Sequence, residues 1–159
     1  MKATRVRRAL LGLAAGCIAG CLVWLAGFLL TSIAGARGVG PFGEFLRALH
    51  NADAAHGWEA AMRYMLSDQS MALARRMAFG LFWTTLLPAS IVAGLVSGIV
   101  ARASWAISLA VGTLACAGPL LLGQADLSLY FGGLLLPCAL CMAVSALAAL
   151  SVGLIRRSP

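Results

Sequence analysis

The residues best suited to chemistry in this 159-residue chain are its five cysteines. Cys138 and Cys141 form a C-x-x-C pair directly after Pro137, and Cys17 and Cys21 lie four positions apart near the start. A helix that begins at the proline would put the pair at its N-terminus, where thiolates are stabilised. Such pairs exchange disulfides or bind soft metals such as Cu(I). Cys138 and Cys141 are therefore the candidate catalytic or soft-metal-binding residues, with Cys21 as a candidate additional ligand.

A second candidate set consists of four potential zinc ligands spaced in steps of three, namely His50, Asp53, His56 and Glu59. On one continuous helix, steps of three turn by about 60° each, so the outermost two would face opposite ways. A bent loop could gather all four, but a solvated loop with helix caps explains the same residues. We therefore expect no bound metal and no other cofactor, and keep these four as the metal candidates.

The composition excludes most classes of soluble protein. Hydrophobic residues make up 62% of the chain and charged residues 11%, whereas soluble domains carry about 25% charged residues. A soluble domain of this size could not bury so much apolar surface, and a disordered chain would contain far less of it. The formal charge of +7 does not indicate a nucleic-acid partner, because the basic residues flank apolar stretches rather than form one patch.

Four long stretches without Asp, Glu, Lys or Arg are each long enough for one membrane-spanning helix and too short for two. The sequence thus predicts an all-α integral membrane protein, a bundle of four transmembrane helices with the lipid bilayer as its surroundings. The predicted order is a basic cytoplasmic tail, span one, an outer loop, spans two to four and a cytoplasmic tail. These segments cover residues 1–8, 9–34, 35–76, 77–100, 103–122, 127–155 and 156–159, with tight turns around Arg102 and at 123–126.

The basic residues at the ends of the spans predict the orientation. Cytoplasmic flanks collect Lys and Arg, which puts both termini and the link between spans two and three inside. The orienting residues are Arg5, Arg7, Arg8, Arg102, Arg156 and Arg157. Arg75 and Arg76 break the rule, because they precede span two on the outer side. Arg greatly outnumbers Lys, beside abundant Ala, Leu and Gly, a bias typical of GC-rich bacterial genomes that indicates a bacterial inner membrane.

The first span also resembles two processing signals. Residues 34–36 (Ala-Gly-Ala) have the small-x-small form of a signal peptidase site, but the preceding apolar stretch is far longer than the usual ~7–15 residues. Residues 18–21 (Ile-Ala-Gly-Cys) resemble a lipoprotein box, which would lipidate Cys21. A lipoprotein would continue with a polar tether, whereas this chain stays apolar, so we expect an uncleaved anchor.

Apolar residues at helical spacing predict two short amphipathic helices in the outer loop. One contains Phe42 and Phe45, and the other contains Trp58 and Met62. Asn51 or Asp53 could cap one helix start, and Ser67, Asp68 or Ser70 another. We expect these helices to lie on the membrane surface or cover the bundle; a partner-binding groove is the alternative.

Small residues recur at every fourth position of each span, which lets helix backbones approach closely. The predicted packing residues are Gly12, Gly16, Gly20, Ser90, Gly94, Gly98, Ser108, Gly112, Cys116, Gly133, Pro137, Cys141, Ser145, Ala149 and Gly153. The ridge in span four is longer than one neighbour requires, so we expect it to be an outward docking face. Pro88, Pro119 and Pro137 are expected to kink or pack within their spans.

The predicted spans contain no Asp, Glu, Lys, Arg or His, which argues against a pump, a proton-coupled exporter or an intramembrane hydrolase. Over the C-x-x-C tetrapeptide and the span count, the chain resembles quinone-linked disulfide oxidases such as vitamin K epoxide reductase. That resemblance implies an electron relay from an outer-loop cysteine pair, and this loop has no cysteine.

The favoured hypothesis is a non-enzymatic accessory or structural subunit that packs against itself as a homo-oligomer or against another membrane protein. The first alternative is a membrane thiol–disulfide oxidoreductase or soft-metal carrier that uses Cys138 and Cys141. The second is a passive channel or lipid-handling bundle.

Overall fold

The computed structural model describes residues 2–101, 105–130 and 135–155, and within those ranges the chain folds into helices without strands. In chain order the elements are α1 (Lys2–Ala36), α2 (Gly40–His56), α3 (Trp58–Met65), α4 (Asp68–Leu81), the π-helix η1 (Phe82–Leu86), α5 (Leu87–Ala101), α6 (Trp105–Ala115), α7 (Ala117–Tyr130) and α8 (Leu135–Ile155).

Among these described residues, four helical stretches are long and apolar enough to cross a membrane, as the sequence predicts. They are Thr4–Ala36, Asp68–Ala101, Ala106–Gly123 and Leu136–Ile155. The outward faces of the first and last stretches carry exposed leucines and isoleucines, a surface that suits a bilayer rather than water. These side chains include Leu10, Ile18, Leu22, Leu30, Leu147, Leu154 and Ile155.

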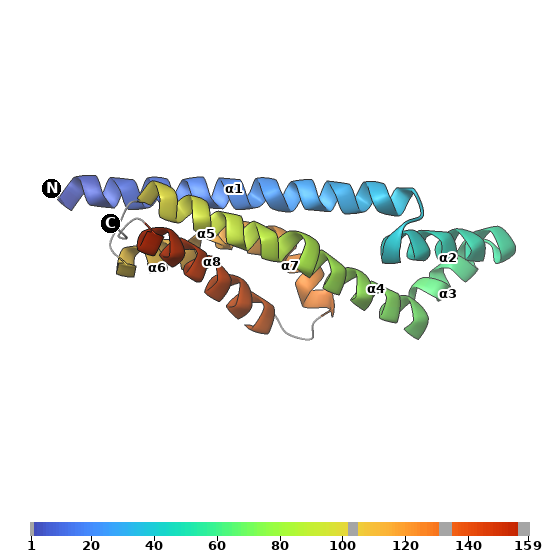
Figure 1. The fold of residues 1–159 in the computed structure, drawn as a ribbon. Coiled ribbons are helices and arrows are strands. Elements are labelled where there is room, and N and C mark those ends of the chain that lie inside the picture. Colours follow the sequence, from blue (N-terminus) through green and yellow to red (C-terminus); the bar gives the residue numbers. More distant parts are fainter. Residues whose placement is uncertain (1, 102–104, 131–134, 156–159) are drawn as a thin grey trace.

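The helices run roughly along one long direction (Figure 1). α1 packs along α5 and η1, which continue the helix that α4 begins, and α5 also contacts α6 and α8. The start of α1 and the end of α8 lie at the same end of the molecule, whereas α2 and α3 project at the opposite end. α5 is therefore the central helix, which explains why its small residues are buried on several sides.

Small residues let α1 and α8 approach α5 from two sides. A Cβ added at Gly16 of α1 would lie 2.6 Å from the carbonyl oxygen of Ala93, and one at Gly12 would lie 2.9 Å from that of Ser97. On the other side, a Cβ at Gly98 would lie 2.8 Å from the carbonyl oxygen of Ala149. At Gly94 it would overlap the backbone of Ser145. Backbone therefore meets backbone here, and van der Waals contact replaces the absent hydrophobic driving force.

The ridge of the last span lies inside the bundle, so the expectation of an outward docking face is wrong for its middle part. Cys141, Ser145 and Ala149 are fully buried in α8. The ridge is long because it serves two neighbours at once. A Cβ at Gly112 of α6 would lie 2.6 Å from the Cβ of Ala149, and the Ser145 hydroxyl donates a hydrogen bond to the carbonyl of Gly112 at 2.7 Å.

The ends of the ridge differ from its middle. At the end of α8, a Cβ added at Gly153 would meet nothing within 4 Å. At its beginning, Pro137 is buried in the first turn, and Gly133 lies outside the described residues. In α6 and α5, the remaining predicted packing residues Ser108 and Ser90 are buried. In α1, Gly20 faces Pro119 and Ala93.

The predicted turn at residues 123–126 is absent, because α7 runs through these residues to Tyr130. A separate interruption falls earlier, at Cys116 between α6 and α7, inside the third candidate span Ala106–Gly123. Pro119 explains it: proline has no N–H to donate to the carbonyl of Ala115, four residues earlier, and its ring clashes there. Glycine costs a helix only about 1 kcal/mol, so Gly123 does not end one.

α2 and α3 occupy the segment where the sequence predicts short amphipathic helices. Gly57 separates them with a φ of 74°, a left-handed conformation that favours glycine. Asn51 and Asp53 lie inside α2 and cap nothing. Ser67 does cap α4, because its hydroxyl oxygen accepts a hydrogen bond from the backbone N–H of Ser70 at 3.2 Å.

Candidate functional site

A π-helix interrupts the second span just before Pro88. In η1 the backbone N–H of Leu87 donates to the carbonyl of Phe82, five residues back. Pro88 has no N–H for the carbonyl four residues before it, so a regular α-helical ladder cannot continue across this point. The sequence predicts a proline kink here, and the structure resolves it as a π-helical turn. Single π-helical turns frequently mark functional sites.

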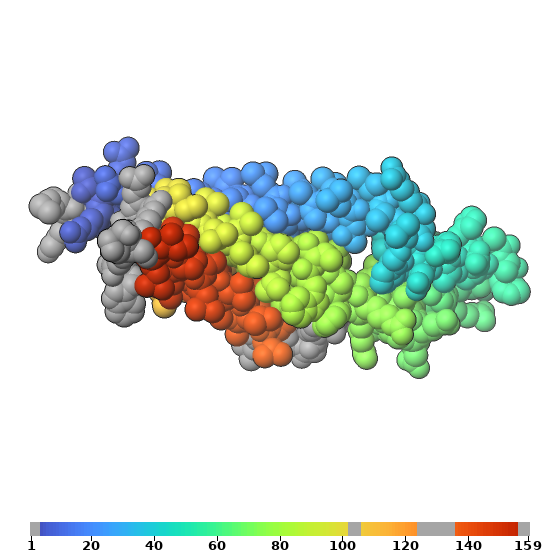
Figure 2. Space-filling model, viewed as in Figure 1, coloured from blue at the N-terminus to red at the C-terminus, as the bar shows by residue number. Residues whose placement is uncertain are grey.

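A cavity of about 340 Å³ lies next to this turn. It is open on one side and lined by the second half of α1, the beginning of α2, the end of α4 and η1. Its lining residues are Phe28, Thr31, Ser32, Pro41, Phe42, Met77, Gly80, Leu81 and Thr84. The face seen in Figure 2 is hollowed there, between the light-blue end of α1, the cyan start of α2 and green α4. The volume falls within the range of about 300–1,000 Å³ typical of small-molecule sites.

The cavity offers a ligand almost no polar groups. Its three hydroxyls come from Thr31, Ser32 and Thr84, and each donates to the carbonyl four residues earlier in its own helix at 2.8–2.9 Å. No charged side chain is among its lining residues. Because the hydroxyl protons are already used, the wall presents methyl, methylene and aromatic surface. A hydrocarbon chain fits this lining, whereas a polar solute would leave its hydrogen bonds unmade.

The start of α2 is tied down where it closes the cavity. Arg47 donates hydrogen bonds to the carbonyls of Gly38 at 3.0 Å and Gly43 at 3.4 Å, which holds the turn between α1 and α2. The ring of Phe42 packs directly on Gly35, at a position where no Cβ would fit. These contacts fix Pro41 and Phe42 as a wall of the cavity.

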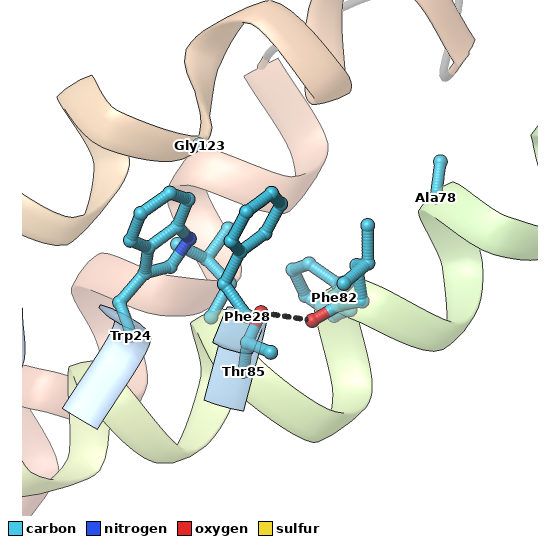
Figure 3. A pocket seen from close by; sticks show the side chains of 8 residues that line it. Trp24, Phe28, Ala78, Phe82, Thr85 and Gly123 are labelled. Carbon is cyan, nitrogen blue, oxygen red and sulfur yellow. Dashed lines mark hydrogen bonds between the residues drawn. The ribbon is translucent and has the colours of Figure 1, made fainter. Parts of the chain in front are cut away.

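An aromatic floor lies deeper in the bundle, around a second pocket of only about 10 Å³ (Figure 3). Trp24 and Phe28 stack with centroids 5.3 Å apart and planes at 10°. Phe82 and Thr85 face them from η1, and the Thr85 hydroxyl donates to the carbonyl of Leu81. Phe28 and Leu81 line both pockets, so the small aromatic pocket directly adjoins the larger cavity.

The structure groups the cysteines differently from the sequence prediction. Cys17 and Cys21 of α1 lie at Gly118 of α7, where an added Cβ would be 2.8 Å from the sulfur of Cys21 and 3.6 Å from that of Cys17. The Cys17 thiol donates to the carbonyl of Ala115 at 3.3 Å, the acceptor that Pro119 leaves unpaired.

The remaining cysteines continue from this pair toward α8. Cys116 is buried and lies near Cys17, Cys138 and Cys141. Cys141 is buried in α8, and Cys138 is half-buried one turn before it. All five thiols are free.

The outer acidic and histidine residues are not gathered. His50, Asp53 and His56 are exposed on α2, and Glu59 is exposed on α3. Glu59 pairs with Arg63 of its own helix at 3.6 Å. Within the ranges that the structure describes, no three His, Cys, Asp or Glu residues are arranged to hold a metal ion.

The structure describes three of the six arginines that predict the orientation. Arg5, Arg7 and Arg8 are exposed on the first turns of α1, whereas Arg102, Arg156 and Arg157 lie outside the described residues.

Sequence reasoning missed the cavity. Its lining residues come from three separate stretches of the chain, two in spans and one at the start of α2, and each is an ordinary small, apolar or hydroxyl residue. The one local signal is Thr84-Thr85 followed closely by Pro88, since hydroxyls that can bond to backbone carbonyls often accompany a proline in a span.

No family model, curated protein or solved structure compared with the chain matches it.

Proposed function

We propose that this chain is a non-enzymatic, multi-pass membrane protein that holds the acyl chain of a phospholipid in the cavity between α1, α2 and α4. The observation that carries the proposal is the apolar cavity of about 340 Å³, whose three hydroxyls are all bonded to their own helices. This function is the lipid-handling alternative of the sequence analysis, and the cavity favours it over the accessory subunit. The small-residue ridges that motivated the subunit are largely used within the chain.

Charge near the cavity supports a phospholipid as the occupant. Arg76 directly precedes Met77, which lines the cavity, and Arg75 and Arg37 are close by in the chain. All three arginines are exposed. Guanidinium groups bind phosphate in bidentate fashion, so a lipid whose tail fills the cavity has cations for its headgroup nearby. The same role accounts for Arg75 and Arg76 at a position where the positive-inside rule disfavours them.

The test is photocrosslinking with a phospholipid that carries a diazirine on one acyl chain. Gly80 lines the cavity, and a Cβ there would meet nothing within 4 Å, so Gly80→Trp fills the cavity without an initial clash. We expect saturable labelling of peptides around Met77 and Phe28 in the purified protein, and its loss in Gly80→Trp. Gly153→Trp is the matched control, because Gly153 also faces open space but lies on α8, away from the cavity. Equal labelling of both variants would refute the proposal.

We further propose that both termini face the cytoplasm of a bacterium and that the spans lie in its inner membrane. Arg5, Arg7 and Arg8 before the first span support this orientation, as does the position of the start of α1 and the end of α8 at one end of the molecule. Alkaline phosphatase inserted at Gly57 should be active, and a fluorescent protein fused to the C-terminus should fluoresce. An inactive phosphatase together with a dark fusion contradicts the orientation.

A second candidate function, the accessory subunit, is favoured by exposed apolar side chains on the projecting helices. Trp58 is 68% exposed and Leu66 83% exposed, with Met62 also exposed beside them. A partner or a second copy would cover these side chains. Native mass spectrometry of the protein extracted in mild detergent should then show a defined additional protein mass, which Trp58→Ser reduces. A monomer in both samples would remove this candidate.

A further inference from the structure

Two thiols of the first span converge on one glycine of another span. Cys17 and Cys21 are separated by one helical turn of α1, so their side chains project from the same face. That face meets Gly118 in the first turn of α7. The point that a Gly118 Cβ would occupy is 2.8 Å from the Cys21 sulfur and 3.6 Å from the Cys17 sulfur. Both sulfurs therefore lie within 4 Å of a single point, at a position where any residue other than glycine would place its Cβ.

A backbone carbonyl at the end of α6 holds Cys17 in place at this point. Pro119 leaves the carbonyl of Ala115 without its usual partner, and the Cys17 S–H donates to it at 3.3 Å. This hydrogen bond fixes the rotamer of Cys17 toward α7. The site is thus oriented by backbone features of α6 and α7 rather than by chance contact.

We propose that Cys17 and Cys21 form a two-thiolate site for a soft metal ion, with Cu(I) as the ion that fits best. Thiolates select Cu(I) among the available metals. In the described part of the chain no third His, Cys, Asp or Glu joins the pair, so the site offers two thiolate ligands. Both thiols lose their protons when the ion binds, so one Cu(I) and two S–H groups give a bis-thiolate complex of charge −1 and two released protons. The copper stays Cu(I), and no oxidant or reductant is involved.

This site is separate from the lipid cavity and from the C-x-x-C pair. None of the cavity-lining residues is a cysteine, and Cys138 and Cys141 lie on α8, beyond Cys116. Cys17 and Cys21, rather than Cys138 and Cys141, are therefore the soft-metal ligands that the geometry supports.

Competition with the Cu(I) chelator bathocuproine disulfonate, on the full chain purified in mild detergent and fully reduced, tests the site. We expect one tightly bound Cu(I) per chain. Cys17→Ser and Cys21→Ser should each weaken the affinity by more than about 100-fold, since loss of an outer-shell partner alone costs 10–100-fold. Cys138→Ser is the matched control, since it removes a half-buried thiol outside the site, and it should keep wild-type affinity.

A second variant separates the geometry from mere thiol content. Gly118→Ala keeps all five thiols, but its methyl group would force the Cys21 sulfur to move. We expect it to weaken Cu(I) binding at least tenfold while the protein keeps its elution volume and helical circular dichroism. Wild-type protein that binds no Cu(I), or a Cys17→Ser/Cys21→Ser double variant that binds it as tightly as wild type, overturns the inference.

Discussion

Gly94→Ala tests the packing of the bundle most directly. The added methyl group would overlap the backbone of Ser145, and backbone cannot move aside without moving α8. Ser145 is also held by its hydrogen bond to the carbonyl of Gly112 in α6, so the strain extends to a third helix. Overpacking of a filled core costs about 1–3 kcal/mol, and the rigid neighbour puts this site at the upper end.

The gain in helix propensity offsets part of that cost. Replacing glycine by alanine inside a helix stabilises by about 1 kcal/mol, which leaves a net loss of about 2 kcal/mol for Gly94→Ala. In a chain of this size, such a loss lowers Tm by about 4–8 °C. Gly153→Ala receives a propensity gain of up to about 1 kcal/mol without the clash, because its Cβ would meet nothing within 4 Å.

Thermal unfolding of both variants in the same detergent, followed by circular dichroism and by aggregation of a fluorescent fusion, measures the difference. We expect Gly94→Ala to unfold well below wild type and Gly153→Ala at or slightly above it. Equal Tm values for the two variants would refute the close approach of α5 and α8, since both substitutions change the same atoms.

Three further substitutions have expected outcomes. Ser145→Ala removes the hydrogen bond to the carbonyl of Gly112 and should lower the free energy of unfolding by about 0.6–2 kcal/mol in denaturant titration. Ser67→Ala removes the cap of α4 and should cost about 1 kcal/mol, seen as faster amide hydrogen exchange in the first turn of that helix. Trp24→Ala removes the stack on Phe28, worth about 0.5–1.5 kcal/mol beyond its buried area, and should lower Tm and enlarge the cavity floor, so that bulkier diazirine lipids crosslink there.

The number of spans could be predicted because it depends on one property, the absence of charge over a stretch long enough to cross a bilayer. The break in the third span could not be placed as well. Gly123 to Asp126 look like a turn between spans three and four in a one-dimensional pattern, yet α7 continues through them. The interruption that Pro119 explains lies earlier, between α6 and α7 inside the third span.

Packing partners were also beyond the sequence. Spacing shows that Cys141, Ser145 and Ala149 share one face, but it does not show which helix meets that face. In the structure, this face of α8 packs against both α5 and α6. The same limit applies to the thiols, because spacing identifies Cys138 and Cys141 as a C-x-x-C motif but does not show that Cys17 and Cys21 contact α7.

The π-helical turn also sets the rotational phase of the second span. A π-helical turn takes up about one residue more than an α-helical turn, and one residue of an α-helix corresponds to about 100° of rotation and 1.5 Å of rise. Deleting one residue between Phe82 and Leu86 would therefore leave α5 seated against α1 and α8 while turning α4 by roughly a quarter of a revolution. Met77 and Gly80 would then point away from α1. The additional residue in η1 therefore sets the rotation of α4 about the helix axis relative to α5, which packs against α1 and α8.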